Sequence, residues 1–134
     1  MKRIIVLAMA ACSVAVLTVA IASSADAGRK APFAGVWAAT DLGDGSSQTL
    51  WISEHGGQYD IDLYDHLATT CDPDSPATGF GVGTLRRNVL SVRMEAWCLS
   101  TEPTYLLSWS GTLIYDPSAD TIVDTGDGLI WHRR

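Results

Sequence analysis

Positive charge is scarce in this chain. Nine lysines and arginines stand against fifteen aspartates and glutamates among the 134 residues, which gives a formal net charge of −6. A surface of this sign repels phosphate backbones and anionic lipid head groups, so we expect neither nucleic acid nor a membrane surface as a partner. The same charge helps to keep a small domain in solution.

Signatures of catalysis are also missing. The sequence has no G-x-S-x-G elbow, P-loop, G-x-G-x-x-G or H-E-x-x-H motif, and its three histidines, at positions 55, 66 and 132, lack metal-ligand spacing. Asp60 and Asp62 share one face of a predicted strand, where a solvated surface is a better interpretation than a catalytic pair. We therefore predict a protein that is not an enzyme and holds no cofactor, with a small hydrolase as the third hypothesis.

The first 27 residues have the pattern of a secretory signal peptide. Lys2 and Arg3 precede an apolar run over 4–22, and Ala25-Asp26-Ala27 supplies a cleavage site. The sequence thus predicts a signal peptide over 1–27, a flexible lead-in over 28–33 and one domain over 34–134. We expect the protein to be secreted, periplasmic or at the cell surface; retention of the leader as an N-terminal membrane anchor is the alternative.

Cysteine is rare, and its positions are informative. Cys12 lies within the predicted leader, which leaves Cys71 and Cys98 in the mature chain. In an oxidising compartment such a pair normally forms a disulfide, so we predict this bond.

Long helical patterns are absent, since no 11-residue stretch has helical periodicity. Short alternating segments instead follow one another between turn residues, which predicts an all-β fold. Short connections favour an eight-stranded antiparallel meander that closes into an up-and-down barrel, with a β-sandwich as the alternative. One long connector is predicted over 66–78. The predicted strands are 34–41, 48–54, 58–65, 79–85, 88–98, 104–115, 120–124 and 128–133.

Three aromatic residues form the candidate binding surface. Trp51, Tyr64 and Trp97 occupy the polar side of their predicted strands, where large rings are unusual. Clusters of exposed aromatic rings often mark binding surfaces. Coverage of these rings by a loop or by the barrel rim is the alternative interpretation.

Two segments share the pattern D-x-G-D-G. Their aspartates have oxygen ligands that suit calcium, although the denser run of a calcium loop is missing and Asp-Gly is also a favoured hairpin corner. We predict no metal site, with calcium as a weak alternative. The aspartates are Asp41, Asp44, Asp124 and Asp127.

The two ends of the predicted domain resemble lipocalins, a family of calycin-type barrels. Gly35-Val36-Trp37 matches the G-x-W motif at the first strand, and Trp131-His132-Arg133-Arg134 closes the last. The resemblance implies that Trp37 lies at the barrel base, covered by Arg133 or Arg134. The second lipocalin motif, T-D-Y, is absent.

Nearly all of the predicted domain is also similar to small secreted bacterial proteins of unknown role. That resemblance implies a barrel fold and no activity. It is carried by Gly35/Trp37, Thr40-Asp41, Asp44-Gly45-Ser46, the strand over 57–65, Cys71/Cys98, the segment over 115–120 and Trp131-His132-Arg133.

The leading prediction is a secreted, monomeric, non-enzymatic barrel that binds a small molecule or an extracellular protein. A deep apolar lumen would favour a small molecule. A filled core with a projecting loop over 66–78 would favour the alternative, an inhibitor of an extracellular hydrolase.

Overall fold

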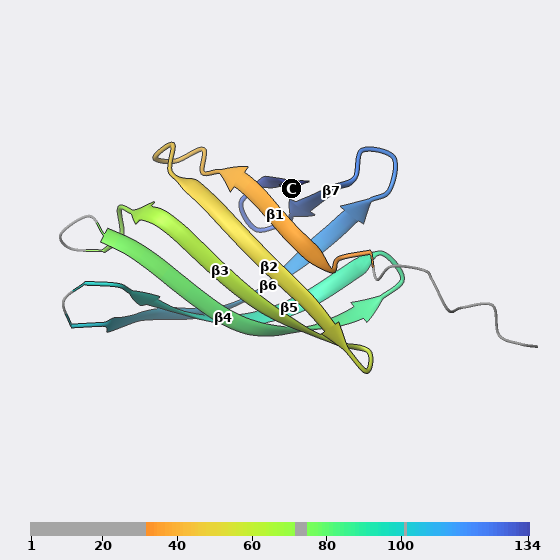
Figure 1. The fold of residues 1–134 in the computed structure, drawn as a ribbon, viewed down its shortest axis with the longest axis horizontal. Coiled ribbons are helices and arrows are strands. Elements are labelled where there is room, and N and C mark those ends of the chain that lie inside the picture. Colours follow the sequence, from red (N-terminus) through yellow and green to blue (C-terminus); the bar gives the residue numbers. More distant parts are fainter. Residues whose placement is uncertain (1–31, 72–74, 101) are drawn as a thin grey trace, which may run out of the picture.

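Eight antiparallel strands close into a barrel (Figure 1). The computed structural model describes residues 32–71, 75–100 and 102–134, and these contain no helix. Each strand pairs with its neighbours in sequence, and the last pairs back with the first. The predicted barrel is confirmed and the sandwich alternative is wrong. The predicted signal peptide over 1–27 lies outside the described residues. The strands are β1 (Gly35–Thr40), β2 (Ser47–His55), β3 (Gln58–Ala68), β4 (Ser75–Arg86), β5 (Val89–Cys98), β6 (Thr104–Asp116), β7 (Thr121–Asp124) and β8 (Ile130–Arg133).

The connector between β3 and β4 is shorter than predicted. It covers 69–74 rather than 66–78, because the ladder continues beyond a register shift between Asp65 and Ala68. The N–H of Cys71 donates to the Ala68 carbonyl at 2.9 Å, and the Cys71–Cys98 disulfide ties this end of β3 to β5. The predicted disulfide is confirmed. Turn-forming residues around position 73 hid this extension in the sequence.

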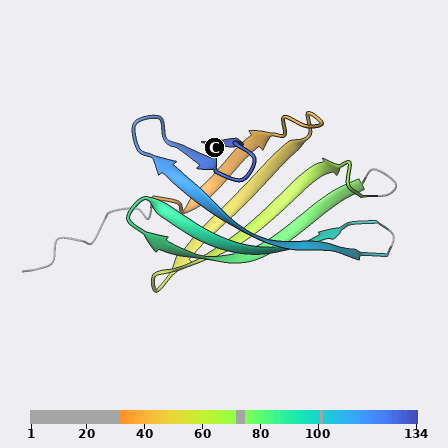
Figure 2. The same ribbon diagram turned by 180° about the vertical axis from the view of Figure 1, so that it is seen from behind.

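Unequal strand lengths make the two ends of the barrel different. β3 to β6 have 10–13 residues, whereas β7 and β8 have four each. β6 therefore pairs with β7 only over 113–116, and its first part pairs with β5 alone. Figures 1 and 2 show the long strands projecting beyond β7 and β8 at the end that carries the β3–β4 and β5–β6 connections. We call this end the mouth and the opposite end the base.

Aromatic residues fill the base. Phe33 and Trp37 have no exposed surface, and Tyr59 is 3% exposed. The Phe33 ring meets Tyr59 edge to face at a centroid distance of 6.1 Å, and Tyr115 lies 5.9 Å from Phe33 and 6.2 Å from Trp37. Aromatic pairs at these distances stabilise a fold by more than the burial of their apolar surface alone. The base is therefore solid.

In the middle of β4, three successive inward positions carry no side chain. Gly79, Gly81 and Gly83 alternate with outward residues, and core side chains of β5 lie over the bare backbone. A Cβ atom on Gly83 would come within 2.8 Å of Leu90 Cδ1, and one on Gly81 would collide with Met94 Sδ and the Arg93 carbonyl oxygen. Glycine is required here because neighbouring side chains take the space.

We expect Gly81→Ala to lower the free energy of unfolding by about 1–3 kcal/mol, the usual effect of overpacking a core. Gly111→Ala on β6 is the matched control, because its Cβ would meet Val92 Cγ2 at 3.6 Å, an ordinary contact distance. That control is expected to change stability by less than about 0.5 kcal/mol. Denaturant unfolding of both variants measures the difference, and equal losses would contradict the packing explanation.

Candidate ligand-binding site

The G-x-W motif and the last strand meet at the base. The guanidinium carbon of Arg133 lies 3.9 Å from the centre of the Trp37 ring, as the lipocalin resemblance implies for one of the two terminal arginines. Gly35 has φ +143°, and a Cβ there would come within 2.6 Å of Arg133 Nη1. Only glycine gives Arg133 room to cross the strand.

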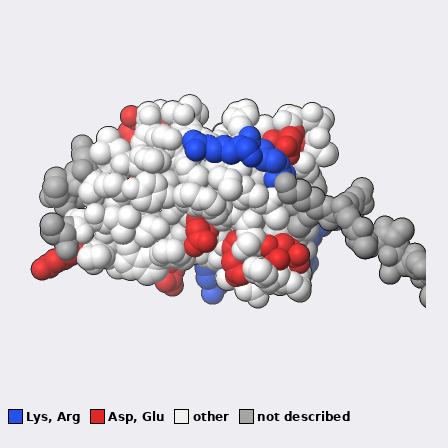
Figure 3. Space-filling model, viewed as in Figure 1, with Lys and Arg blue, Asp and Glu red and all other residues white. Residues whose placement is uncertain are grey.

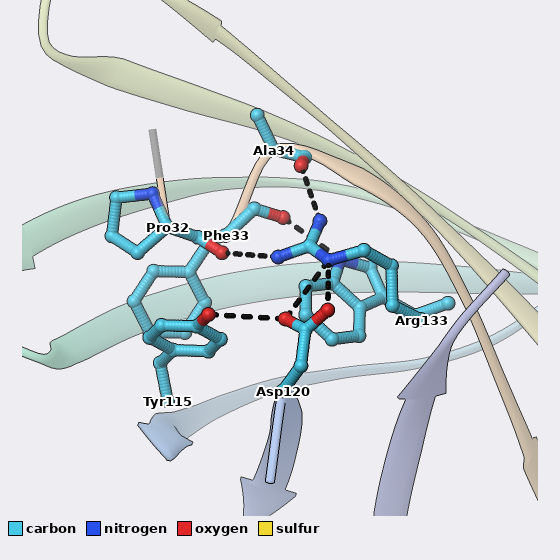
Figure 4. A network of polar contacts seen from close by, with 7 residues as sticks. Pro32, Phe33, Ala34, Tyr115, Asp120 and Arg133 are labelled. Carbon is cyan, nitrogen blue, oxygen red and sulfur yellow. Dashed lines mark hydrogen bonds and ion pairs between the residues drawn. The ribbon is translucent and has the colours of Figure 1, made fainter. Parts of the chain in front are cut away.

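Hydrogen bonds hold Arg133 in this position (Figure 4). Its Nη1 and Nη2 donate to the carbonyls of Ala34 at 2.7 Å and Pro32 at 2.9 Å, and its Nε donates to the Asp120 carboxylate at 2.9 Å. Trp37 Nε1 donates to the Phe33 carbonyl at 2.8 Å. The arginine thus fastens the N-terminal segment across the base, which closes that end to ligands.

The candidate aromatic surface divides into separate groups on the outer face. Trp51 is 43% exposed and faces Asp62 across the ladder, while Tyr64 packs edge to face on His66 at 4.9 Å. Trp97 lies between two further rings, each with its centre 5.8 Å away. These belong to Phe80 and Tyr105, which sequence reasoning missed.

The G-F-G-V-G alternation of β4 contained the signal for Phe80. Glycines on the inner face send Phe80 and Val82 outward, where they are 50% and 47% exposed. Figure 3 shows that charged groups are few and scattered over the face presented in Figure 1, which leaves a broad uncharged area. Whether the outer rings bind a partner stays a prediction.

The D-x-G-D-G segments form the same hairpin turn twice. Asp41 Oδ1 accepts the Gly43 N–H at 2.6 Å, and Asp124 Oδ1 accepts the Gly126 N–H at 2.8 Å. The glycine that ends each segment has φ 78° or 79°. The second aspartates, at 44 and 127, accept the N–H groups two residues further on, each at 2.8 Å. The N–H of Ser46 lowers the pKa of the Asp44 carboxyl.

One oxygen of each of these carboxylates, Oδ1, therefore serves its own turn. Among the residues that the structure describes, no group of three or more histidine, cysteine, aspartate or glutamate side chains is placed to hold a metal ion. The shared pattern reflects hairpin geometry, in which a glycine with positive φ completes the corner.

The mouth contains an apolar cavity of about 180 Å³. Its wall is built from small inward-facing residues of β3 to β5, such as Ala77 and Ala96, and from three large residues of β6. Leu107 stays 42% exposed although it faces inward, because β7 ends before reaching it. The lining residues are Leu63, Asp65, Ala68, Thr70, Ala77, Thr78, Ala96, Leu106, Leu107 and Trp109.

A smaller void of about 40 Å³ lies deeper in the barrel. Leu63 and Trp109 border both spaces, and the remaining wall of the void is mostly aliphatic. Two polar groups interrupt that wall. They belong to Asp124 and Trp131.

Both polar groups are unusual for a barrel interior. Trp131 is 4% exposed, and its Nε1–H has no hydrogen-bond partner among the described residues. A buried donor left unpaired costs about 1–3 kcal/mol. Burial raises the pKa of the Asp124 carboxyl, against the lowering effect of the Gly126 N–H, and the nearby Asp127 charge raises it further. Sequence reasoning placed Asp124 at the end of the predicted strand over 120–124 and in a D-x-G-D-G pattern, but assigned its carboxylate no place in the barrel interior.

A wider hollow of about 480 Å³ lies on the outer face between the β1–β2 and β7–β8 hairpins. Outward-facing residues such as Ile130 and His132, which are exposed, line much of it.

Among the described residues, no helix is long and apolar enough to cross a membrane. Comparisons with protein-family models, curated proteins and solved structures found no match for the chain.

Proposed function

We propose that this protein is a non-enzymatic barrel that binds a small apolar molecule through its mouth. The observation that carries the proposal is the cavity of about 180 Å³ in an interior that is otherwise packed solid towards the base. Pockets for drug-sized ligands have about 300–1,000 Å³, so the ligand is smaller than these. Each buried methylene contributes about 0.8 kcal/mol, which gives short aliphatic chains micromolar to millimolar affinity.

The proposed setting is outside the cytoplasm. The disulfide between Cys71 and Cys98 supports this setting, because such bonds persist in oxidising compartments. The inhibitor hypothesis depended on a long loop over 66–78. It has less support, because β3 and β4 together take up most of that interval.

The cavity is tested by filling it. Ala96 is 6% exposed and lines the mouth, so the ring of Ala96→Phe would occupy the ligand space. We expect the wild-type protein to bind 1-octanol saturably, measured by tryptophan fluorescence because Trp109 lines the cavity, and the variant to bind at least about tenfold more weakly.

Ser91→Phe is the matched control, since it adds the same ring to the exposed side of β5. It should leave octanol affinity unchanged. Denaturant unfolding checks that both variants are folded, and Ala77→Leu on the neighbouring strand β4 replaces Ala96→Phe if that variant is unstable. Absence of saturable binding by the wild type, or equal weakening by the two phenylalanines, would contradict the proposal.

A further inference from the structure

Two residues that line the deeper void can supply one hydrogen-bond donor and one acceptor. The donor is the buried, unpartnered Nε1–H of Trp131. The acceptor is the Asp124 carboxylate, which β7 carries inward opposite Leu113. Asp124 Oδ1 is already occupied by the Gly126 N–H at 2.8 Å, which leaves acceptor capacity on Oδ2.

The size of the void restricts the group that fits. A site needs roughly 10–15 Å³ to hold one water, so about 40 Å³ accommodates a group no larger than a hydroxyl with its carbon. A hydroxyl accepts one hydrogen bond and donates another, which matches Trp131 and Asp124 together. A carboxylate would bring a second negative charge next to Asp124, and an ammonium group has no acceptor for Trp131.

We propose that the ligand is an aliphatic alcohol whose chain fills the mouth cavity and whose hydroxyl sits between Trp131 and Asp124. This inference rests on the proposed function, because the chain needs the mouth cavity. Leu63 and Trp109 border both spaces, and the proposal requires one of these side chains to move aside when the ligand binds. The chain then lies among alanine and leucine side chains while its hydroxyl satisfies the buried donor.

Two isomers test the inference on the wild-type protein. 1-Octanol and 1-methoxyheptane have the same formula and similar apolar area, but the ether cannot donate a hydrogen bond. We expect the alcohol to bind about tenfold more tightly, as measured by calorimetric titration, since the lost bond goes to a charged acceptor. The indole N–H resonance of Trp131 should move in the nitrogen–proton NMR spectrum when the alcohol binds.

The two D-x-G-D-G turns provide a pair of matched variants. Asp124→Asn and Asp41→Asn each remove one charge while retaining the oxygen that accepts the turn N–H. Because burial raises the pKa of Asp124, its ionised form disfavours folding, and Asp124→Asn is expected to stay folded. We expect it to reduce the preference for the alcohol to below about threefold, whereas Asp41→Asn keeps the full preference.

The outcomes separate the two proposals. If neither isomer binds, the proposed function fails. If both bind with equal affinity, the barrel binds apolar chains but the void recognises no hydroxyl, and ordered water alone satisfies Trp131. Equal effects of Asp41→Asn and Asp124→Asn would likewise overturn the role of Asp124, and an unmoved Trp131 resonance would overturn that of Trp131.

Discussion

Trp37→Ala is expected to lower the free energy of unfolding by about 3–5 kcal/mol, the range for removing a large aromatic ring from a core. Trp37 has no exposed surface, packs on Tyr115 and carries the Arg133 guanidinium over its ring. Truncation therefore leaves a cavity and also removes the surface against which Arg133 is held. Denaturant unfolding followed by circular dichroism measures the loss.

Trp51→Ala is the matched control for this substitution. The same number of atoms is removed from a ring that is 43% exposed on the outer face of β2, so we expect a loss below about 1 kcal/mol. Similar losses in the two variants would show that the base is not the principal core. A small loss for Trp37→Ala would also remove the basis of the lipocalin-like interpretation of the G-x-W motif.

Strand periodicity predicted most of the fold. The alternation in 88–98 placed Leu90, Val92, Met94 and Ala96 on the buried side, and each is 7% exposed or less. Period-two patterns carry this information because a one-residue shift would reverse every side chain. The β3–β4 connection was less predictable. The ladder there is held by a disulfide and continues past a register shift, neither of which the alternation reports.

The candidate site was harder to predict than the fold. A cavity depends on which inward side chains face one another across the barrel, and this follows from strand length and register rather than from any local motif. The short β7 and β8 leave the mouth partly uncovered, and the small residues Ala77 and Ala96 leave its interior unfilled. Asp124 was placed at the end of a predicted strand and in a turn pattern, and neither assignment indicated that it lines an interior void opposite Leu113.

Loss of the Cys71–Cys98 disulfide is the second change with a large expected effect. The bond closes a loop of 28 residues, from a sequence separation of 27, and in the chain-entropy model it stabilises the fold by about 3.5 kcal/mol. We expect the Cys71→Ser/Cys98→Ser variant to lose about that amount in denaturant unfolding. Intact-mass measurement of the wild type with and without reductant should differ by two hydrogens, and two freely alkylated thiols in unreduced protein would contradict the bond.

Loss of the disulfide is also expected to weaken octanol binding, because the bond lies at the mouth of the barrel. Cys71 and Cys98 pack in one small cluster with Ala68, Ala77 and Leu106, and these last three also line the cavity. Reduction of the wild type should therefore lower octanol affinity under conditions in which circular dichroism shows the barrel still folded. The double-serine variant is the control, since reductant should change neither its stability nor its binding. Unchanged octanol affinity in folded, reduced protein would show that β3 and β4 hold the mouth without the bond.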